Sequence, residues 1–89
     1  MRHVRIVVRG RVHGVFFRAS FADVARRLGL DGSVTNRPDG AVEAEVQGND
    51  EDVEEAIAWS RRGPELARVD SVEISEETGT LPEPGFRVT

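Results

Sequence analysis

The residues with the clearest chemical potential lie at positions 10–18, where the sequence GRVHGVFFR joins an extended segment to a helix. The first N–H groups of a helix have no partner within the helix and lie at the positive end of its dipole, so they can bind an anion such as phosphate. Gly14 lets the loop approach a ligand closely, and Arg18 adds a planar, charged group that can hold two oxygens at once. This pattern predicts an anion site with Arg18 as its main side chain, although glycines before helices and surface arginines are common by themselves.

A second segment with chemical content ends at Asn36, directly before a Pro38-Asp39-Gly40 turn. An amide side chain both donates and accepts hydrogen bonds, so Asn36 can orient a small polar molecule. Asparagine also occurs at such positions simply because its side chain stabilises turns. We assign Asp39 and Gly40 to the turn itself and keep Asn36 as a candidate site residue.

Alternation of apolar and polar residues predicts strands with one buried face, and apolar residues at helical spacing predict amphipathic helices. Asn49 and Asp50 can cap the second helix, and the Gly63-Pro64 pair ends it. A Pro/Gly loop separates the last main strand from a short terminal one. The expected strands cover residues 4–12, 33–36, 42–47, 69–75 and 86–88, and the expected helices cover about 16–28 and 50–63.

The order of these elements, strand-helix-strand-strand-helix-strand, indicates the fold class. In a chain of 89 residues it predicts one domain spanning 1–89, of the α+β class. The simplest arrangement is a ferredoxin-like βαββαβ sandwich, with a four-stranded antiparallel sheet and both helices on one face.

Composition limits the chemistry. With no cysteine and two histidines, the chain offers no thiol nucleophile and little for a metal site, so we expect no metal and no cofactor. A formal net charge of −4 argues against a general nucleic-acid binder. Since there is neither a signal-peptide pattern nor a span of about 20 apolar residues, we expect a cytoplasmic protein with no membrane partner. We also expect a monomer with no nucleic-acid partner.

Positive charge is concentrated near the two candidate segments. All 12 basic residues are arginine, and Arg9, Arg11, Arg18 and Arg37 lie in or beside these segments. A local positive site on an acidic body attracts small anions. Whether Arg37 attracts substrate or is a solvated surface residue stays open here, as does the choice between a GC-rich genome and salt adaptation as the source of the lysine-free composition.

The two segments together resemble the motifs of the acylphosphatase family, G-x-V-Q-G-V-x-F-R and G-W-V-x-N-x-x-D-G-x-V-E. The resemblance covers nearly the whole chain, and it departs at His13, where the family more often has glutamine, and at Ser33, where it has tryptophan. Ser33 affects packing and stability more than chemistry. The matching residues are Gly10, Val12, Gly14, Val15, Phe17 and Arg18 in the first motif and Gly32, Val34, Asn36, Asp39, Gly40, Val42 and Glu43 in the second.

The resemblance implies metal-independent hydrolysis of the carboxyl–phosphate bond of a small-molecule acyl phosphate, which gives a carboxylate and inorganic phosphate. Arg18 matches the arginine that binds the substrate phosphate, and Asn36 matches the asparagine that positions the attacking water. Because His13 would contribute mainly its backbone, we expect activity to survive this departure from the motif. The residues whose backbone amides would form the phosphate cradle are His13, Gly14, Val15, Phe16 and Phe17.

Two alternatives remain. His13 could act as a phosphorylated nucleophile, since imidazole can attack phosphorus, but no second group that would orient it is evident. The chain could also be a non-catalytic ferredoxin-like module that binds an anion, a peptide or RNA. RNA is disfavoured because residues 42–47 lack the aromatic pattern of an RNA-binding strand.

Overall fold

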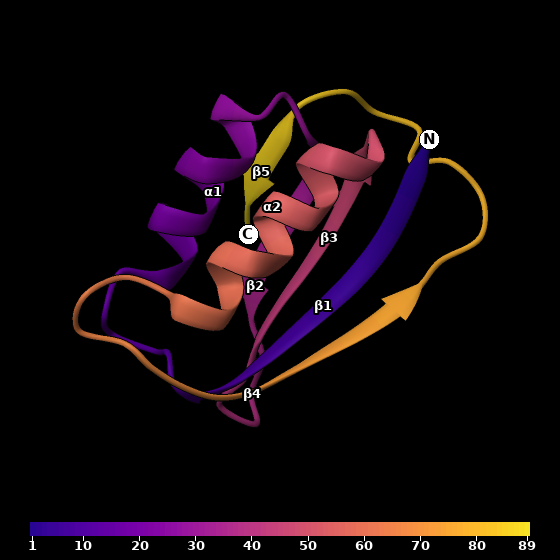
Figure 1. Cartoon of the computed structure of the whole chain (residues 1–89). Helices are drawn as coiled ribbons and strands as arrows, with labels where there is room; N and C mark the ends of the chain where they lie inside the picture. The colour runs from indigo at the N-terminus through magenta and orange to yellow at the C-terminus, as the bar shows by residue number, and fades with distance from the viewer.

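The structure is a computed structural model that describes all residues from 1 to 89. Five strands form one sheet in the order β4-β1-β3-β2-β5, and two helices cover one of its faces (Figure 1). Neither helix has the length and apolar character needed to cross a membrane. The strands are β1 (Arg2–Arg11), β2 (Asp31–Asn36), β3 (Val42–Gly48), β4 (Arg68–Glu76) and β5 (Phe86–Val88), and the helices are α1 (Phe17–Arg27) and α2 (Asp50–Arg62).

The hydrophobic core lies between the helices and the sheet. Alternate residues of β1, such as Val4 and Ile6, are fully buried there, as the period of two in the sequence predicts. Aromatic rings join the two helices, because the Trp59 ring of α2 lies 5.3 Å from the Phe17 ring and 5.8 Å from the Phe21 ring of α1. Phe17 is thereby fixed in the core at the first residue of α1, which places the start of the helix firmly above the sheet.

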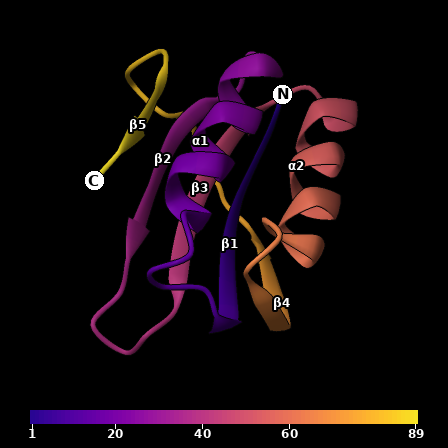
Figure 2. The same cartoon turned by 90° about the vertical axis from the view of Figure 1, so that its left-hand side faces the viewer.

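The sheet differs from the expected four-stranded antiparallel arrangement, because Phe86–Val88 forms a fifth strand at its edge. β5 pairs with β2 in parallel, with Gly32 opposite Phe86 and Val34 opposite Val88. All other neighbouring strands are antiparallel, so the sheet is mixed. The physical reason is that residues 77–85 cross from the β4 edge to the β2 edge, so that β5 enters beside β2 in the same direction (Figures 1 and 2).

The crossing segment 77–85 is held by hydrogen bonds along the end of the sheet. The N–H of Glu77 donates to the main-chain oxygen of His3 at 2.8 Å. The N–H of Leu81 donates to Gln47 Oε1, and that of Gly85 donates to Asp31 Oδ1, both at 2.8 Å. These contacts guide the chain to β2 and bring its last residues beside α1.

Replacing Phe86 by alanine tests whether β5 is part of the core. The Phe86 side chain is 6% exposed, and its ring lies 5.8 Å from that of Phe21. Because the substitution leaves a cavity under α1, we expect the free energy of unfolding to fall by about 3 kcal/mol. Urea denaturation measures this change, and Arg87→Ala on the exposed side of β5 is the control. Equal stability of the two variants would show that β5 packs loosely.

Candidate active site

The segment predicted as an anion site, residues 10–18, includes a loop of residues 12–16 between the end of β1 and the start of α1. The pairing of β1 with β4 shifts register between Arg9 and Gly10. Gly10 has φ 136°, and a Cβ there would lie 2.2 Å from the main-chain oxygen of Arg68, so only glycine fits. Gly14 has φ 71° in open space, and this left-handed turn directs the loop back toward the sheet.

The N-terminus of α1 has no side-chain cap. Phe16 occupies the N-cap position, makes no side-chain hydrogen bond to the helix, and is followed by no acidic residue in the first turn. By contrast, Asn49 caps α2 by accepting a hydrogen bond from the N–H of Asp52 at 2.9 Å. The first N–H groups of α1 therefore have no side-chain acceptor and are available to an anionic ligand.

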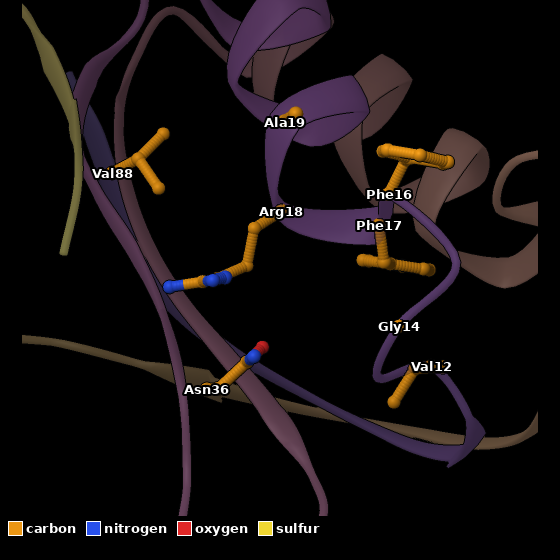
Figure 3. Close-up of a pocket in the computed structure, with 8 residues that line it drawn as sticks. All are labelled: Val12, Gly14, Phe16, Phe17, Arg18, Ala19, Asn36 and Val88. Atoms are coloured by element: carbon orange, nitrogen blue, oxygen red, sulfur yellow. The ribbon is translucent and has the colours of Figure 1, made fainter.

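A pocket of about 270 Å³ opens at this junction. Figure 3 shows the side chains of Arg18 and Asn36 reaching toward one another across it. The strand directions explain why they meet. Both β1 and β2 run antiparallel to β3, so the C-terminal ends of β1 and β2 lie at the same end of the sheet. The lining residues are Val12, Gly14, Phe16, Phe17, Arg18, Ala19, Asn36 and Val88.

Asn36, the last residue of β2, has an unusual hydrogen-bonding state. Its Oδ1 is buried and has no hydrogen-bond partner, the only buried side-chain nitrogen or oxygen of the chain in that state. A buried amide oxygen without a donor costs free energy, and native proteins rarely leave one unsatisfied unless water or a ligand binds it. Because Asn36 lines the pocket, its amide is the side-chain group through which it can bind a molecule there.

Arg18 is half-buried, and its charge has no carboxylate side chain as partner. Its Nη1 donates to the main-chain oxygen of Thr89 at 2.8 Å, which fixes the guanidinium at the β5 side of the pocket. A guanidinium has five N–H donors, so this single contact leaves others for a bound anion. Arg18 is thus oriented by its contact with Thr89 and has no acidic side chain as partner.

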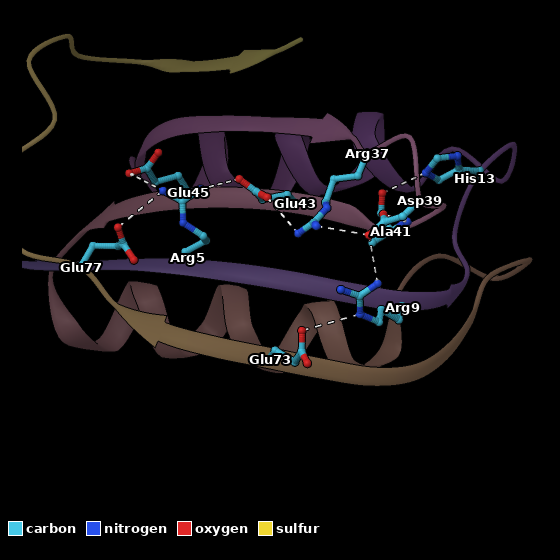
Figure 4. A network of polar contacts seen from close by, with 10 residues as sticks. All are labelled: Arg5, Arg9, His13, Arg37, Asp39, Ala41, Glu43, Glu45, Glu73 and Glu77. Atoms are coloured by element: carbon cyan, nitrogen blue, oxygen red, sulfur yellow. Dashed lines mark hydrogen bonds and ion pairs between the residues drawn. The ribbon is translucent and has the colours of Figure 1, made fainter.

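Two other arginines near the motifs are paired with acids. Arg37 lies 3.2 Å from Asp39 and 3.3 Å from Glu43, and Arg9 lies 3.3 Å from Asp39 and 3.6 Å from Glu73. These pairs lie on the sheet face opposite the helices (Figure 4), and neither arginine lines the pocket. Arg37 therefore lies outside the pocket and pairs with acids of the turn after β2 and of β3.

That turn is held by Asp39. The N–H of Ala41 donates to Asp39 Oδ1 at 3.1 Å, and this bond, followed by Arg9 and Arg37, lowers the pKa of the Asp39 carboxyl below its ordinary value of 3.8. A carboxylate with a lowered pKa stabilises the fold above its ordinary pKa, and the contribution is lost as the pH falls through the lowered value. Asp39 is accordingly ionised at neutral pH, the state in which it accepts these contacts.

The structure separates His13 and Val15 from the other proposed cradle residues, since neither lines the pocket. Val15 is buried in the core and anchors the loop there. The His13 ring contacts the main-chain oxygen of Ala41 through Nε2 at 3.0 Å (Figure 4). His13 therefore ties the loop before α1 to the turn after Asn36.

Replacing His13 by alanine tests this tie. Loss of one hydrogen bond of ordinary strength predicts a rise in KM of about 2- to 10-fold. We expect kcat to be nearly retained, because the ring contacts the turn and not the pocket. Steady-state hydrolysis of benzoyl phosphate measures both constants. A loss of kcat beyond about 10²-fold would instead support covalent catalysis by His13.

Some lining residues were not identified from the sequence. Val12 and Ala19 flank predicted site residues, so their neighbourhood was foreseeable. Val88 and the contact of Thr89 with Arg18 had no local signal, because β5 reaches the site only through its long-range pairing with β2. Ser33, which departs from the family motif, is half-buried next to the buried Val34 and takes no part in the pocket. No three His, Asp or Glu residues group as they would to hold a metal ion.

A helix-covered α+β sheet with an uncapped helix, an arginine and an unsatisfied amide around one pocket is typical of the class of small α+β proteins with an anion site. Comparison with known proteins identifies the family within this class. The family model for acylphosphatase matches residues 4–88. The chain belongs to the acylphosphatase family.

Individual relatives agree with this assignment. An acylphosphatase from Thiobacillus denitrificans is 52% identical over 79 residues, which cover 89% of each chain. One from Rubrobacter xylanophilus is 47% identical over 87 residues, covering 98% of this chain and 79% of that protein. Among solved structures, that of acylphosphatase from Bacillus subtilis superimposes with a TM-score of 0.96 at 29% identity, covering 100% of this chain and 99% of the other.

Proposed function

We propose that Arg18, the first backbone amides of α1 and Asn36 together carry out the hydrolysis of acyl phosphates, the reaction of the family to which the chain belongs. Water attacks phosphorus, the bond between phosphorus and the carboxyl oxygen breaks, and the carboxylate leaves with the bonding electrons. The products are a carboxylate and inorganic phosphate. The observation that carries this proposal is the unsatisfied side-chain oxygen of Asn36, a residue that lines the same pocket as Arg18.

Phosphate binding is assigned to Arg18 and the loop. The guanidinium can hold two phosphate oxygens in its planar fork, and the unpaired N–H groups at the start of α1 can bind the others. Phosphoryl transfer depends mainly on positioning and on stabilisation of the charge that develops on these oxygens. The backbone of residues 13–17 is proposed as the cradle, with Gly14, Phe16 and Phe17 lining the pocket directly.

Asn36 is assigned to the attacking water. An amide is too weak a base to remove a proton from water, so its contribution is orientation: Oδ1 accepts a hydrogen bond and directs the water oxygen toward phosphorus. One proton stays with the new P–O bond, and a phosphate oxygen can accept the other. This role uses the acceptor that the folded chain leaves free.

The leaving group needs no help from an acid. A carboxylic acid has a pKa of about 4, so the carboxylate departs unprotonated at neutral pH. Arg18 and the N-terminus of α1 provide the positive charge that stabilises the phosphate oxygens. The reaction therefore requires neither a general acid nor a metal ion.

The test is hydrolysis of benzoyl phosphate by the purified protein in EDTA. We expect turnover with inorganic phosphate as a competitive inhibitor, because product and substrate share the phosphate cradle. A folded protein that does not hydrolyse benzoyl phosphate would refute the proposal. The non-catalytic alternative predicts the opposite pattern, in which an anion or RNA binds without any turnover, and family membership weighs against it.

We further propose that the chain acts as one domain, as a monomer in the cytoplasm, with a small-molecule acyl phosphate as its partner. The net charge of −4 supports the absence of a nucleic-acid partner. Size-exclusion chromatography of the active protein tests the monomeric state, and an active dimer that loses activity on dilution would contradict it.

A further inference from the structure

Phe16 combines two unfavourable features at the mouth of the pocket. It is the only non-glycine residue with positive φ, at 65°, a left-handed conformation that side chains with a Cβ rarely adopt. Its side chain is also 75% exposed, although it is large and apolar. Backbone strain costs folding free energy and an exposed aromatic ring contributes almost none, and strained residues of this kind cluster at functional sites.

The neighbouring residues explain how the fold maintains this conformation. Val15 and Phe17 are both buried in the core, so the residue between them must point outward. The main-chain oxygen of Phe16 accepts the first helical hydrogen bond, from the N–H of Ser20 at 3.0 Å. Because the residues before and after Phe16 are both anchored in the core, the Phe16 ring is held at the pocket although it does not contribute to the core itself.

Exposed apolar residues gather at this pocket. The molecule exposes four large apolar side chains, and two of them, Phe16 at 75% and Val88 at 42%, line it. Figure 3 shows Val88 on one side of Arg18 and Phe16 on the other, with Ala19 on the same turn of the helix as Arg18. The pocket therefore has a polar part, formed by Arg18 and Asn36, and an apolar rim.

An acyl phosphate has the same division, with a charged phosphate at one end and an acyl group at the other. We propose that Phe16 and Val88 contact the acyl group, and that the enzyme consequently prefers acyl phosphates with an aromatic or bulky apolar acyl group over acetyl phosphate. This inference rests on the proposed function, since it assumes that the phosphate occupies the Arg18 end. Phe16 then has two separate parts: its amide belongs to the cradle, and its ring determines specificity.

The test compares kcat/KM for benzoyl phosphate and acetyl phosphate in the wild type, in Phe16→Gly and in Val88→Ala. Glycine adopts positive φ readily, so the loop keeps its path while the ring is removed. We expect the ratio of benzoyl to acetyl kcat/KM to fall by about 3- to 10-fold in Phe16→Gly, the range expected for one aromatic contact. A smaller fall in the same direction is expected for Val88→Ala, which loses less apolar area.

Leu66→Ala is the matched control, because Leu66 is 69% exposed and does not line the pocket. Its ratio should equal that of the wild type. If Phe16→Gly changes kcat/KM for both substrates by the same factor, the substitution has affected the cradle. A change in the ratio of the two kcat/KM values shows the effect of the ring. An unchanged ratio in Phe16→Gly, or a wild type that prefers acetyl phosphate, overturns the inference while leaving the proposed function intact. If the wild type hydrolyses neither substrate, the proposed function itself fails, and this inference fails with it.

Discussion

Replacing Arg18 by alanine is expected to lower kcat/KM for benzoyl phosphate by at least about 10²-fold, the usual loss when a charged donor is removed from a site of developing negative charge. Arg18 is the only cationic side chain that lines the pocket, so no neighbour there can replace its charge. Phosphate binding should be lost together with turnover. The inhibition constant of inorganic phosphate, measured alongside the hydrolysis rate, tests both losses.

Arg27→Ala is the matched control for this variant. Arg27 belongs to the same helix, is exposed and lies away from the pocket, so its removal changes the net charge equally. Arg18→Lys adds a finer test, because lysine keeps the charge but loses the planar fork, and its activity should lie between those of the alanine variant and the wild type. Near wild-type hydrolysis by Arg18→Ala would show that the anion is held elsewhere.

Asn36→Ala is expected to lower kcat by about 10²-fold, because a water molecule without its acceptor is no longer aligned with phosphorus. The inhibition constant of inorganic phosphate should change little, since Arg18 and the loop remain. This separation of binding from turnover distinguishes Asn36 from Arg18 more clearly than either activity alone.

Thr35→Ala provides the comparison for Asn36. Thr35 is the preceding residue of β2 and projects to the opposite side of the sheet, so this variant perturbs the same strand without reaching the pocket. Its kinetics should match the wild type. If Asn36→Ala lost phosphate binding as severely as turnover, Asn36 would have to be reassigned from the water to the phosphate.

The elements of the fold could be predicted because their signals are local. Residues such as Phe21 and Val24 recur at helical spacing and are buried, and the alternation around Ala44 marks a buried strand face. The bounds of these elements differ from expectation by two residues or fewer. The place of Phe86–Val88 could not be predicted, because its pairing with β2 depends on hydrogen bonds between a loop and residues more than 30 positions away in sequence, such as Gln47 and Asp31.

The candidate site also has a part that local sequence signals predicted and a part that depends on long-range contacts. The sequence identified Arg18 and Asn36 by their motifs, and the structure brings both to one pocket because β1 and β2 end at the same edge of the sheet. Their catalytic roles remain predictions. The hydrogen bond of Arg18 to Thr89 and the exposed ring of Phe16 were not predicted, since the first depends on β5 and the second on a left-handed backbone conformation that the residue type does not suggest.

The central claim is that the pocket holds phosphorus for attack by a water molecule oriented by Asn36. Hydrolysis of benzoyl phosphate in ¹⁸O-labelled water, with EDTA present, tests it most directly, because the position of the label identifies the bond that breaks. The account predicts label in inorganic phosphate and none in benzoate. Label in benzoate would mean that water attacks the carbonyl carbon, and it would contradict the roles assigned to Arg18, the loop amides and Asn36.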